Sequence, residues 1–318
     1  MVWMYIGIIM IMRVVQSVFS KKSADKMPQN MIGYLKYTAV YQGVAALSAG
    51  VLLLAEIIGG KSLTGIGETT LYAGLSGAAL AIYCMCTIYC LETGTMVLNS
   101  VFSTAGLLIP TVASIFLFGE TLAWYKWLAV AIFMVGAYLL IGNSKHIYGK
   151  FKLSTLVVLL LTLTTNGVTM LLQKLFGERV EGGSVSLFSF ATFASGVLFV
   201  LVILAVAYAA YRFGGKNETA EKSGENTFTI FPKENESLKI GGGLLIYGAV
   251  LGIALFVINQ LATMSAPLIS AVALFATING GATVISAIVG WLMFNEKSGY
   301  KSIIGITLSV GSLILLQV

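Results

Sequence analysis

Long runs of apolar residues without charges dominate this sequence, and their length is the strongest constraint on its fold. Hydrophobic residues make up 58% of the 318 residues and charged residues 10%, and the mean hydropathy is +0.92. A helix needs about 20 apolar residues to cross the roughly 30 Å hydrocarbon core of a bilayer, and it satisfies its backbone hydrogen bonds internally. The runs are about twice as long as the strands of an outer-membrane barrel. We therefore predict an all-α, polytopic membrane protein.

Ten such runs are separated by segments rich in glycine, proline or charge. The runs cover residues 2–20, 31–57, 71–91, 95–118, 125–141, 153–173, 185–211, 244–262, 267–294 and 301–318. Residues 1–12 lack the basic segment and cleavage site of a signal peptide, so we expect the first run to be a spanning helix. The polar stretch 214–240 has the composition of a solvated loop.

The two halves of the chain repeat a short pattern. Phe118-Gly119-Glu120 precedes the fifth run, and Phe294-Asn295-Glu296 precedes the tenth. Residues 15–22, at the end of the first run, resemble residues 168–174, at the end of the sixth. We therefore predict two repeats of five helices each, 1–142 and 153–318. An odd number of crossings inverts the second repeat in the membrane, and inverted repeats are an architecture of alternating-access carriers.

With these motifs in both halves, the chain resembles the EamA-like family of the drug/metabolite transporter superfamily. The resemblance covers essentially the whole chain and rests on the recurrence of the Phe-x-Glu turn and of a glycine-bearing last helix. It implies a ten-helix carrier whose central cavity is lined by the first four helices of each half, with the fifth helices packed outside. Substrates in the superfamily range over amino acids, amines, drugs, nucleosides and sugar conjugates, so the resemblance implies no single cargo.

Polar side chains inside the apolar runs are the candidate binding groups. Arg13 lies at membrane depth, where a charge costs about 2.5–3.5 kcal/mol on insertion scales, so we expect it to face the bundle interior. It can bind an anionic substrate there or form a structural pair, and both interpretations stay open. Asn166 lies at the equivalent depth in the sixth run.

The second run carries an aromatic stripe. Tyr34, Tyr37 and Tyr41 follow one another at i, i+3 and i+7, with Gln42 beside them. Such a stripe can line a cavity for amines or flat rings, and the alternatives are interfacial anchoring for Tyr34 and core packing for the others. Other polar residues inside the runs can bind a substrate or hydrogen-bond to a neighbouring helix. These candidates are Tyr83, Asn99, Ser103, Asn259 and Asn279.

Glycine and proline mark three positions inside the runs. Two glycines follow Asn279 and are expected to weaken its helix and free backbone carbonyls. Pro110 is expected to kink the fourth run. Gly248 and Gly252 form a small-xxx-small pair typical of helix packing.

No Asp or Glu lies at the centre of an apolar run. Proton-coupled carriers commonly use an intramembrane carboxylate, so we expect exchange or facilitated diffusion, with Glu92 as the marginal candidate for ion coupling. The sequence has no P-loop motif, no HExxH motif and no histidine inside a run. We therefore expect no enzyme activity, no metal and no cofactor.

The sequence thus predicts a transporter of a small polar or amphipathic metabolite or drug, an exporter or exchanger that works by alternating access. Its expected partners are a small-molecule substrate and the lipid bilayer of a bacterial plasma membrane, with the chain as a monomer or homodimer. The net charge is +6, but the basic residues are scattered, so we expect no nucleic acid partner. A lipid-linked sugar flippase and a non-transporting structural or sensor protein stay open as alternatives.

Membrane orientation is tested by reporter fusions at Val318. Lysines gather in the connections after odd-numbered runs, as at Lys21 and Lys150, so the positive-inside rule predicts both termini outside. The family resemblance implies the reverse, and the sequence leaves the orientation open. An active phosphatase fused at Val318 places this end outside the cell and supports the charge count. A silent phosphatase together with a fluorescent protein fusion that fluoresces places it in the cytoplasm and contradicts the count.

Overall fold

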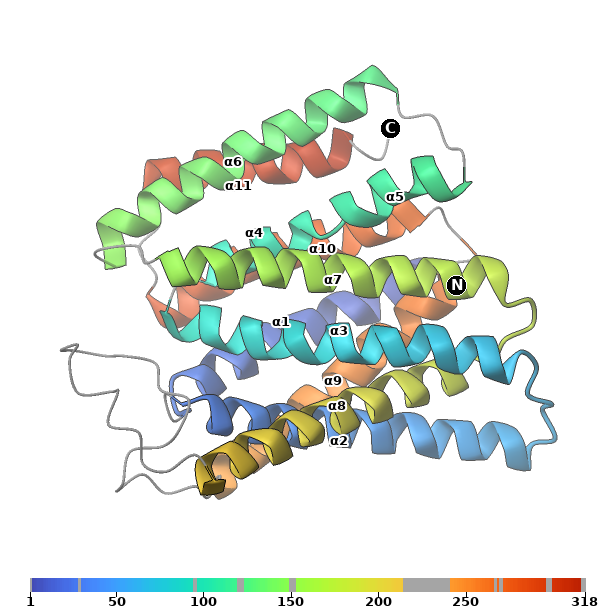
Figure 1. The fold of residues 1–318 in the computed structure, drawn as a ribbon. Helices are drawn as coiled ribbons and strands as arrows, with labels where there is room; N and C mark the ends of the chain where they lie inside the picture. Colours follow the sequence, from blue (N-terminus) through green and yellow to red (C-terminus); the bar gives the residue numbers. More distant parts are fainter. Residues whose placement is uncertain are drawn as a thin grey trace.

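The computed structural model describes residues 2–27, 30–93, 96–118, 123–148, 153–213, 241–265, 268, 271–295 and 299–315. Within these ranges the chain forms eleven helices and no strand (Figure 1). The helices of the first half are α1 (Val2–Ala24), α2 (Met31–Ile58), α3 (Ile66–Thr93), α4 (Met96–Ala105), α5 (Leu108–Phe118) and α6 (Trp124–Tyr148). Those of the second half are α7 (Leu153–Arg179), α8 (Val185–Phe213), α9 (Gly242–Ser265), α10 (Ala271–Phe294) and α11 (Tyr300–Leu315).

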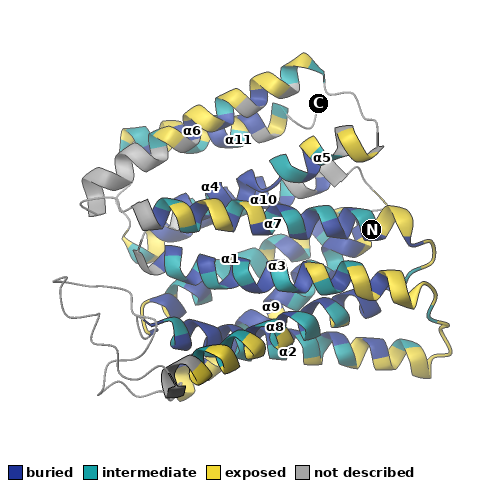
Figure 2. Ribbon diagram, viewed as in Figure 1, coloured by how far each residue is buried: buried dark blue, intermediate teal, exposed yellow. Residues whose placement is uncertain are grey.

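Seven of the described helices are long and apolar enough to cross a membrane, namely α1, α2, α3, α7, α8, α9 and α10. Exposed residues lie along the outside of these helices (Figure 2), and many of them are large hydrophobic residues. On α2, for example, the side chains of Leu47 and Val51 are 72% and 69% exposed. Soluble proteins rarely expose large contiguous apolar surfaces. The prediction of an all-α membrane protein is therefore confirmed.

Helices from the two halves of the sequence interleave across the bundle. α3 packs against α7 and α8, α2 against α8 and α9, and α1 against α9 and α10. α4 packs against α10, and α6 and α11 pack against each other at one edge (Figure 1). α1 and α7, the first helices of the two halves, run in opposite directions along the bundle (Figure 1).

The fourth predicted run forms two helices instead of one. The break falls at residues 106–107, where the backbone N–H of Gly106 bonds to the carbonyl of Ser103, three residues back, at 3.2 Å. Pro110 has no N–H to donate to the carbonyl of Gly106 four residues earlier. That carbonyl accepts from the N–H of Ile109 instead, at 3.0 Å. The disturbance expected from Pro110 is thus a break one turn before it.

Close backbone approach joins α9 to α2. A Cβ atom on Gly252 would meet the carbonyl oxygen of Tyr41 and would lie 2.7 Å from Cβ of Val44. One turn earlier, a Cβ atom on Gly248 would lie 3.1 Å from Cγ1 of Val40. The small-xxx-small pair is therefore a packing face, as the sequence predicts.

Replacing Gly252 by alanine should lower the stability of the protein by about 1–3 kcal/mol, the usual effect of overpacking, because the new methyl group meets backbone. Gly74→Ala on α3 is the matched control because nothing lies within 4 Å of its added Cβ. Alanine in a helix is about 0.5–1 kcal/mol more favourable than glycine. Thermal unfolding in detergent should move the two midpoints in opposite directions, and a Gly252→Ala midpoint at or above that of the control contradicts this packing.

Candidate functional site

Three adjoining cavities lie inside the bundle, and all three are lined by Gln16 of α1 and Tyr83 of α3. Together with the open solvent at their mouths, two of them measure about 500 Å³ each and the third about 330 Å³. Arg13 and Asn279 line both larger cavities. Because the three spaces share walls, we treat them together as the central cavity. Its walls come from α1, α3 and α4 of the first half and from α7, α9 and α10 of the second, with Tyr41 of α2 at the smallest cavity.

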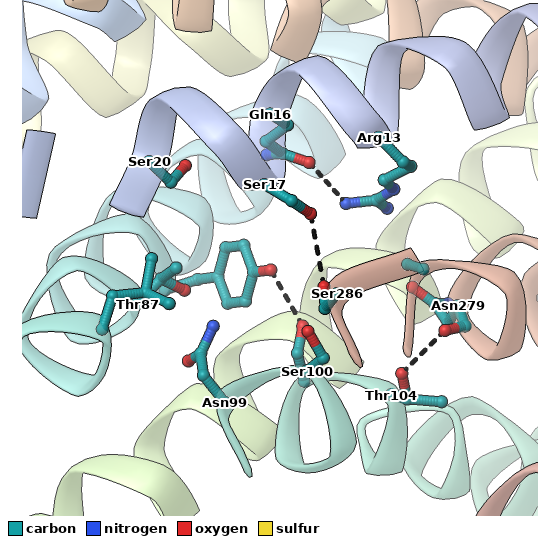
Figure 3. Close-up of a pocket in the computed structure, with 14 residues that line it drawn as sticks. Arg13, Gln16, Ser17, Ser20, Thr87, Asn99, Ser100, Thr104, Asn279 and Ser286 are labelled. Carbon is teal, nitrogen blue, oxygen red and sulfur yellow. Dashed lines mark hydrogen bonds between the residues drawn. The ribbon is translucent and has the colours of Figure 1, made fainter. Parts of the chain in front are cut away.

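α1 turns one polar face to the central cavity (Figure 3). Arg13, Gln16, Ser17 and Ser20 follow one another at i, i+3, i+4 and i+7, which is one face of a helix. Nη1 of Arg13 donates to Oε1 of Gln16 at 2.8 Å, and Oγ of Ser17 lies 3.2 Å from Oγ of Ser286 on α10. Of these four residues, only Arg13 is among the candidates from the sequence. The other three share its helical spacing, and this spacing is the signal that identifies them.

A second wall joins α3, α4 and α7. The hydroxyl of Tyr83 lies 2.8 Å from Oγ of Ser103, and Nδ2 of Asn166 donates to the Ser103 carbonyl at 2.7 Å. Asn99, one turn before Ser103 on α4, also lines the cavity (Figure 3). These four residues, candidates from three different apolar runs, therefore lie together.

A third wall is formed where α4 meets α10. Oγ1 of Thr104 donates to the carbonyl of Asn279 at 3.0 Å and lies 2.9 Å from Oγ1 of Thr283 (Figure 3). α10 continues as a helix through Gly280 and Gly281, so the weakening expected after Asn279 produces no break. The Asn279 carbonyl accepts the hydrogen bond of Thr104 from within this continuous helix. Nothing in the sequence distinguishes Thr104 and Thr283 from other threonines.

α7 and α9 form the opposite side of the cavity. Nε2 of Gln173 donates to Oδ1 of Asn259 at 2.9 Å. Asn166, Thr169 and Gln173 are spaced i, i+3 and i+7 along α7, much as the polar residues are along α1. Apolar side chains complete this side, and they are Leu80, Met170, Leu255, Ile258, Ala262 and Ile278.

Two candidates from the second run lie away from the cavity. Tyr37 is fully buried in the core, and its hydroxyl is hydrogen-bonded to Oγ of Ser23. Gln42 is fully buried at the contact with α8, where a Cβ atom on Gly196 would lie 3.2 Å from Cδ of Gln42. Tyr37 packs against Gly248 of α9, and Tyr34 is buried beside Tyr89 of α3. Of the stripe, Tyr41 is the residue that lines the cavity. Core packing, the alternative open at sequence level, is the role of Tyr37.

Acidic side chains are absent from the described residues that line the central cavity. Glu56 lies near the end of α2, where it accepts hydrogen bonds from Ser184 and Ser186 at 2.9 Å and pairs with Lys61 at 3.1 Å. The side chain of Glu92, the coupling candidate, lies outside the described part of the chain. The cavity therefore combines one guanidinium group with neutral amides, hydroxyls and apolar side chains.

A crystal structure described only as "Crystal structure of protein" aligns with 98% of this chain and 94% of its own length, with a TM-score of 0.62 and 13% sequence identity. At this identity the likeness concerns the fold alone. No protein-family model matches the sequence, and no curated protein matches it.

The contact of Thr104 with Thr283 is expected to stabilise the protein by about 0.6–1.7 kcal/mol, the range measured for hydrogen bonds between membrane helices. A double-mutant cycle of Thr104→Val and Thr283→Val isolates this interaction because valine keeps the shape of threonine. The measurement is the free energy of unfolding in mixed detergent micelles. Thr104→Val combined with Thr307→Val on the exposed face of α11 should be additive, and equal coupling in the two cycles contradicts a specific contact.

Proposed function

We propose that this protein is a secondary or facilitative carrier that moves a small polar or amphipathic molecule across a membrane by alternating access. The observation that carries the proposal is the polar central cavity inside an apolar bundle, between helices of both halves. Polar side chains at membrane depth are unfavourable unless they face a partner or a water-filled space, and they commonly mark a substrate path. Carriers built from repeats bind their substrates at the interface between the repeats.

The packing of the helices supports two related halves. In the exchange of the two halves, α1 corresponds to α7, α2 to α8 and α3 to α9. The contact of α1 with α9 then corresponds to that of α7 with α3, and the contact of α2 with α9 to that of α8 with α3. The contact of α1 with α10 becomes that of α7 with α4 and α5. The remaining major pairs, α2 with α8, α4 with α10 and α6 with α11, exchange into themselves. Such a pattern is expected of a pseudo-two-fold axis.

A matched pair of ion pairs also supports the repeat. Lys21 lies 3.8 Å from Asp25 at the end of α1, and Lys174 lies 3.7 Å from Glu178 at the end of α7. Both pairs are spaced i, i+4, and both lysine side chains are largely buried, at 14% and 8% exposure. Because α1 and α7 run in opposite directions (Figure 1), these equivalent ends lie at opposite ends of the bundle. This is the relation that an inverted repeat requires.

The helix count is compatible with ten crossings. α4 and α5 together occupy the fourth apolar run, so the eleven helices correspond to the ten runs of the sequence. None of the described side chains of α6 and α11 lines the central cavity, and the two helices pack against each other at the edge of the bundle. These are the positions that the EamA-like resemblance implies for the fifth helix of each half.

Weak hydroxyl contacts between the halves suit a carrier whose halves separate in turn. Ser17 of α1 meets Ser286 of α10, and Thr104 of α4 meets Thr283 of the same helix. Water can replace each contact when the cavity opens, so separation leaves no buried polar group without a partner. Since the described cavity lining has no acid, we propose exchange or facilitated diffusion.

A reversible crosslink between α1 and α10 tests the proposal. Ser17→Cys and Ser286→Cys are introduced into a chain whose native cysteines, Cys84, Cys86 and Cys90, are replaced by alanine. A metabolite uptake and efflux screen in cells with and without the protein identifies a transported compound, and its flux is then measured in proteoliposomes. Oxidation should lower this flux at least about tenfold, and reduction should restore it, because the halves can no longer separate.

The two single-cysteine chains are the controls and should keep their flux under oxidation. Full flux through the crosslinked protein contradicts relative motion of the halves. Metabolite profiles that do not depend on the protein contradict transport itself and favour a structural or sensor role.

A further inference from the structure

We propose that the central cavity binds an amphipathic organic anion, with the Arg13 guanidinium holding the carboxylate, phosphate or sulfonate group. This inference rests on the proposed function where it calls the anion a transported substrate, but the binding site itself stands on the geometry of the cavity. It makes Arg13 the residue that selects the charge of the substrate.

The charge of Arg13 is not balanced by any described acid. Its side-chain neighbours are Gln16, which accepts from Nη1 at 2.8 Å, and the phenol of Tyr83, and both are neutral groups. The ion pairs of the described residues involve Lys21, Lys61 and Lys174. Nε of Arg13 is buried and has no hydrogen-bond partner. A guanidinium presents five N–H donors in a fork that matches two oxygens of an anion, and the neighbours of Arg13 supply no negative charge to this fork.

The position of Arg13 makes this capacity available to a ligand. Its side chain is half-buried and lines both of the larger cavities, so it borders empty space on two sides. Figure 3 shows it beside Gln16 on α1, at the cavity that Thr87 of α3 and Asn99 of α4 also line. Amides and hydroxyls can donate hydrogen bonds to further oxygens of an anion. In a site of low dielectric constant, an unbalanced positive charge favours a negative ligand and disfavours a cation.

The apolar side chains on the opposite side of the cavity determine which body the anion can carry. Leu80, Leu255 and Ile258 line the cavity that Arg13 also borders. Ligand sites of this kind bury an apolar body against such side chains and fix its orientation with a few polar groups. The lining therefore fits an anion that carries an aliphatic or aromatic body, and it fits free inorganic phosphate poorly.

Four phenyl compounds of matched size test the charge preference on the full chain purified in detergent. Phenyl phosphate and benzenesulfonate are the anions, phenyltrimethylammonium is the cation and benzyl alcohol is the neutral compound. The measurement is the apparent dissociation constant from the ligand-dependent rise of the unfolding midpoint. The two anions should stabilise the protein, and the cation and the alcohol should do so at least about tenfold more weakly.

Variants of Arg13 test the assigned group. Arg13→Gln should weaken binding of both anions at least about tenfold, and Arg13→Lys should weaken it less because the charge stays while the fork is lost. Arg179→Gln is the matched control because Arg179 is exposed at the end of α7, and it should bind as the parent chain does. If Arg13→Gln does not fold, the inference is tested by the weaker anion binding expected of Arg13→Lys and by the preference of the parent chain for the two anions.

Three results overturn the inference: no response to either anion, equal or stronger binding of the cation or the alcohol, or anion binding that Arg13→Gln leaves unchanged. The flux measurement separates this inference from the proposed function. Anion binding through Arg13 without any metabolite flux contradicts only the carrier proposal. Flux of cations or neutral compounds without anion binding contradicts only the inference on charge.

Discussion

The structure depends on keeping every polar group of the chain away from hydrocarbon. Backbone groups are satisfied inside helices, and this requirement selects helices for the long apolar runs. Side chains then divide by solvent. Residues such as Leu47 and Val51 point outward, whereas Asn166 of α7 hydrogen-bonds to Ser103 of α4 inside the bundle, and Gln16 bonds to Arg13 within α1. The same constraint that builds the bundle therefore concentrates its chemistry at the centre.

Much of this division can be predicted from the sequence because length and hydropathy depend on local composition. The long apolar runs, and the inward position of Arg13, Tyr83, Asn99 and Asn166, follow from the unfavourable free energy of placing polar groups in lipid. What composition cannot predict is which neighbour a helix face meets. Tyr37 and Gln42 have the same spacing and polarity as cavity-lining residues, but α2 presents them to α8 and α9. Helix packing decides their role, and packing depends on residues distant in sequence.

The remaining differences have local causes that are visible only with coordinates. The break at Gly106 combines the missing N–H of Pro110 with close approach to α7, where a Cβ atom on Gly106 would lie 2.8 Å from the Leu163 carbonyl oxygen. The sequence indicates the first cause but not the second. Thr104 likewise becomes part of the site because the hydroxyl of Thr283 on α10 lies 2.9 Å from its own. A small hydroxyl residue in an apolar helix carries no sign of such a partner.

The break between α4 and α5 divides one apolar run of the sequence into two helices with different surroundings. α4 carries Asn99, Ser100, Ser103 and Thr104, all of which line the central cavity, whereas none of the described α5 side chains lines it. α5 packs instead against α7. The ten residues of α4 also include Val101 and Phe102, which are buried in the core. In the proposed carrier, α4 therefore has to satisfy the cavity and the packing of the bundle at the same time, so a change of cargo is constrained by how this short helix packs.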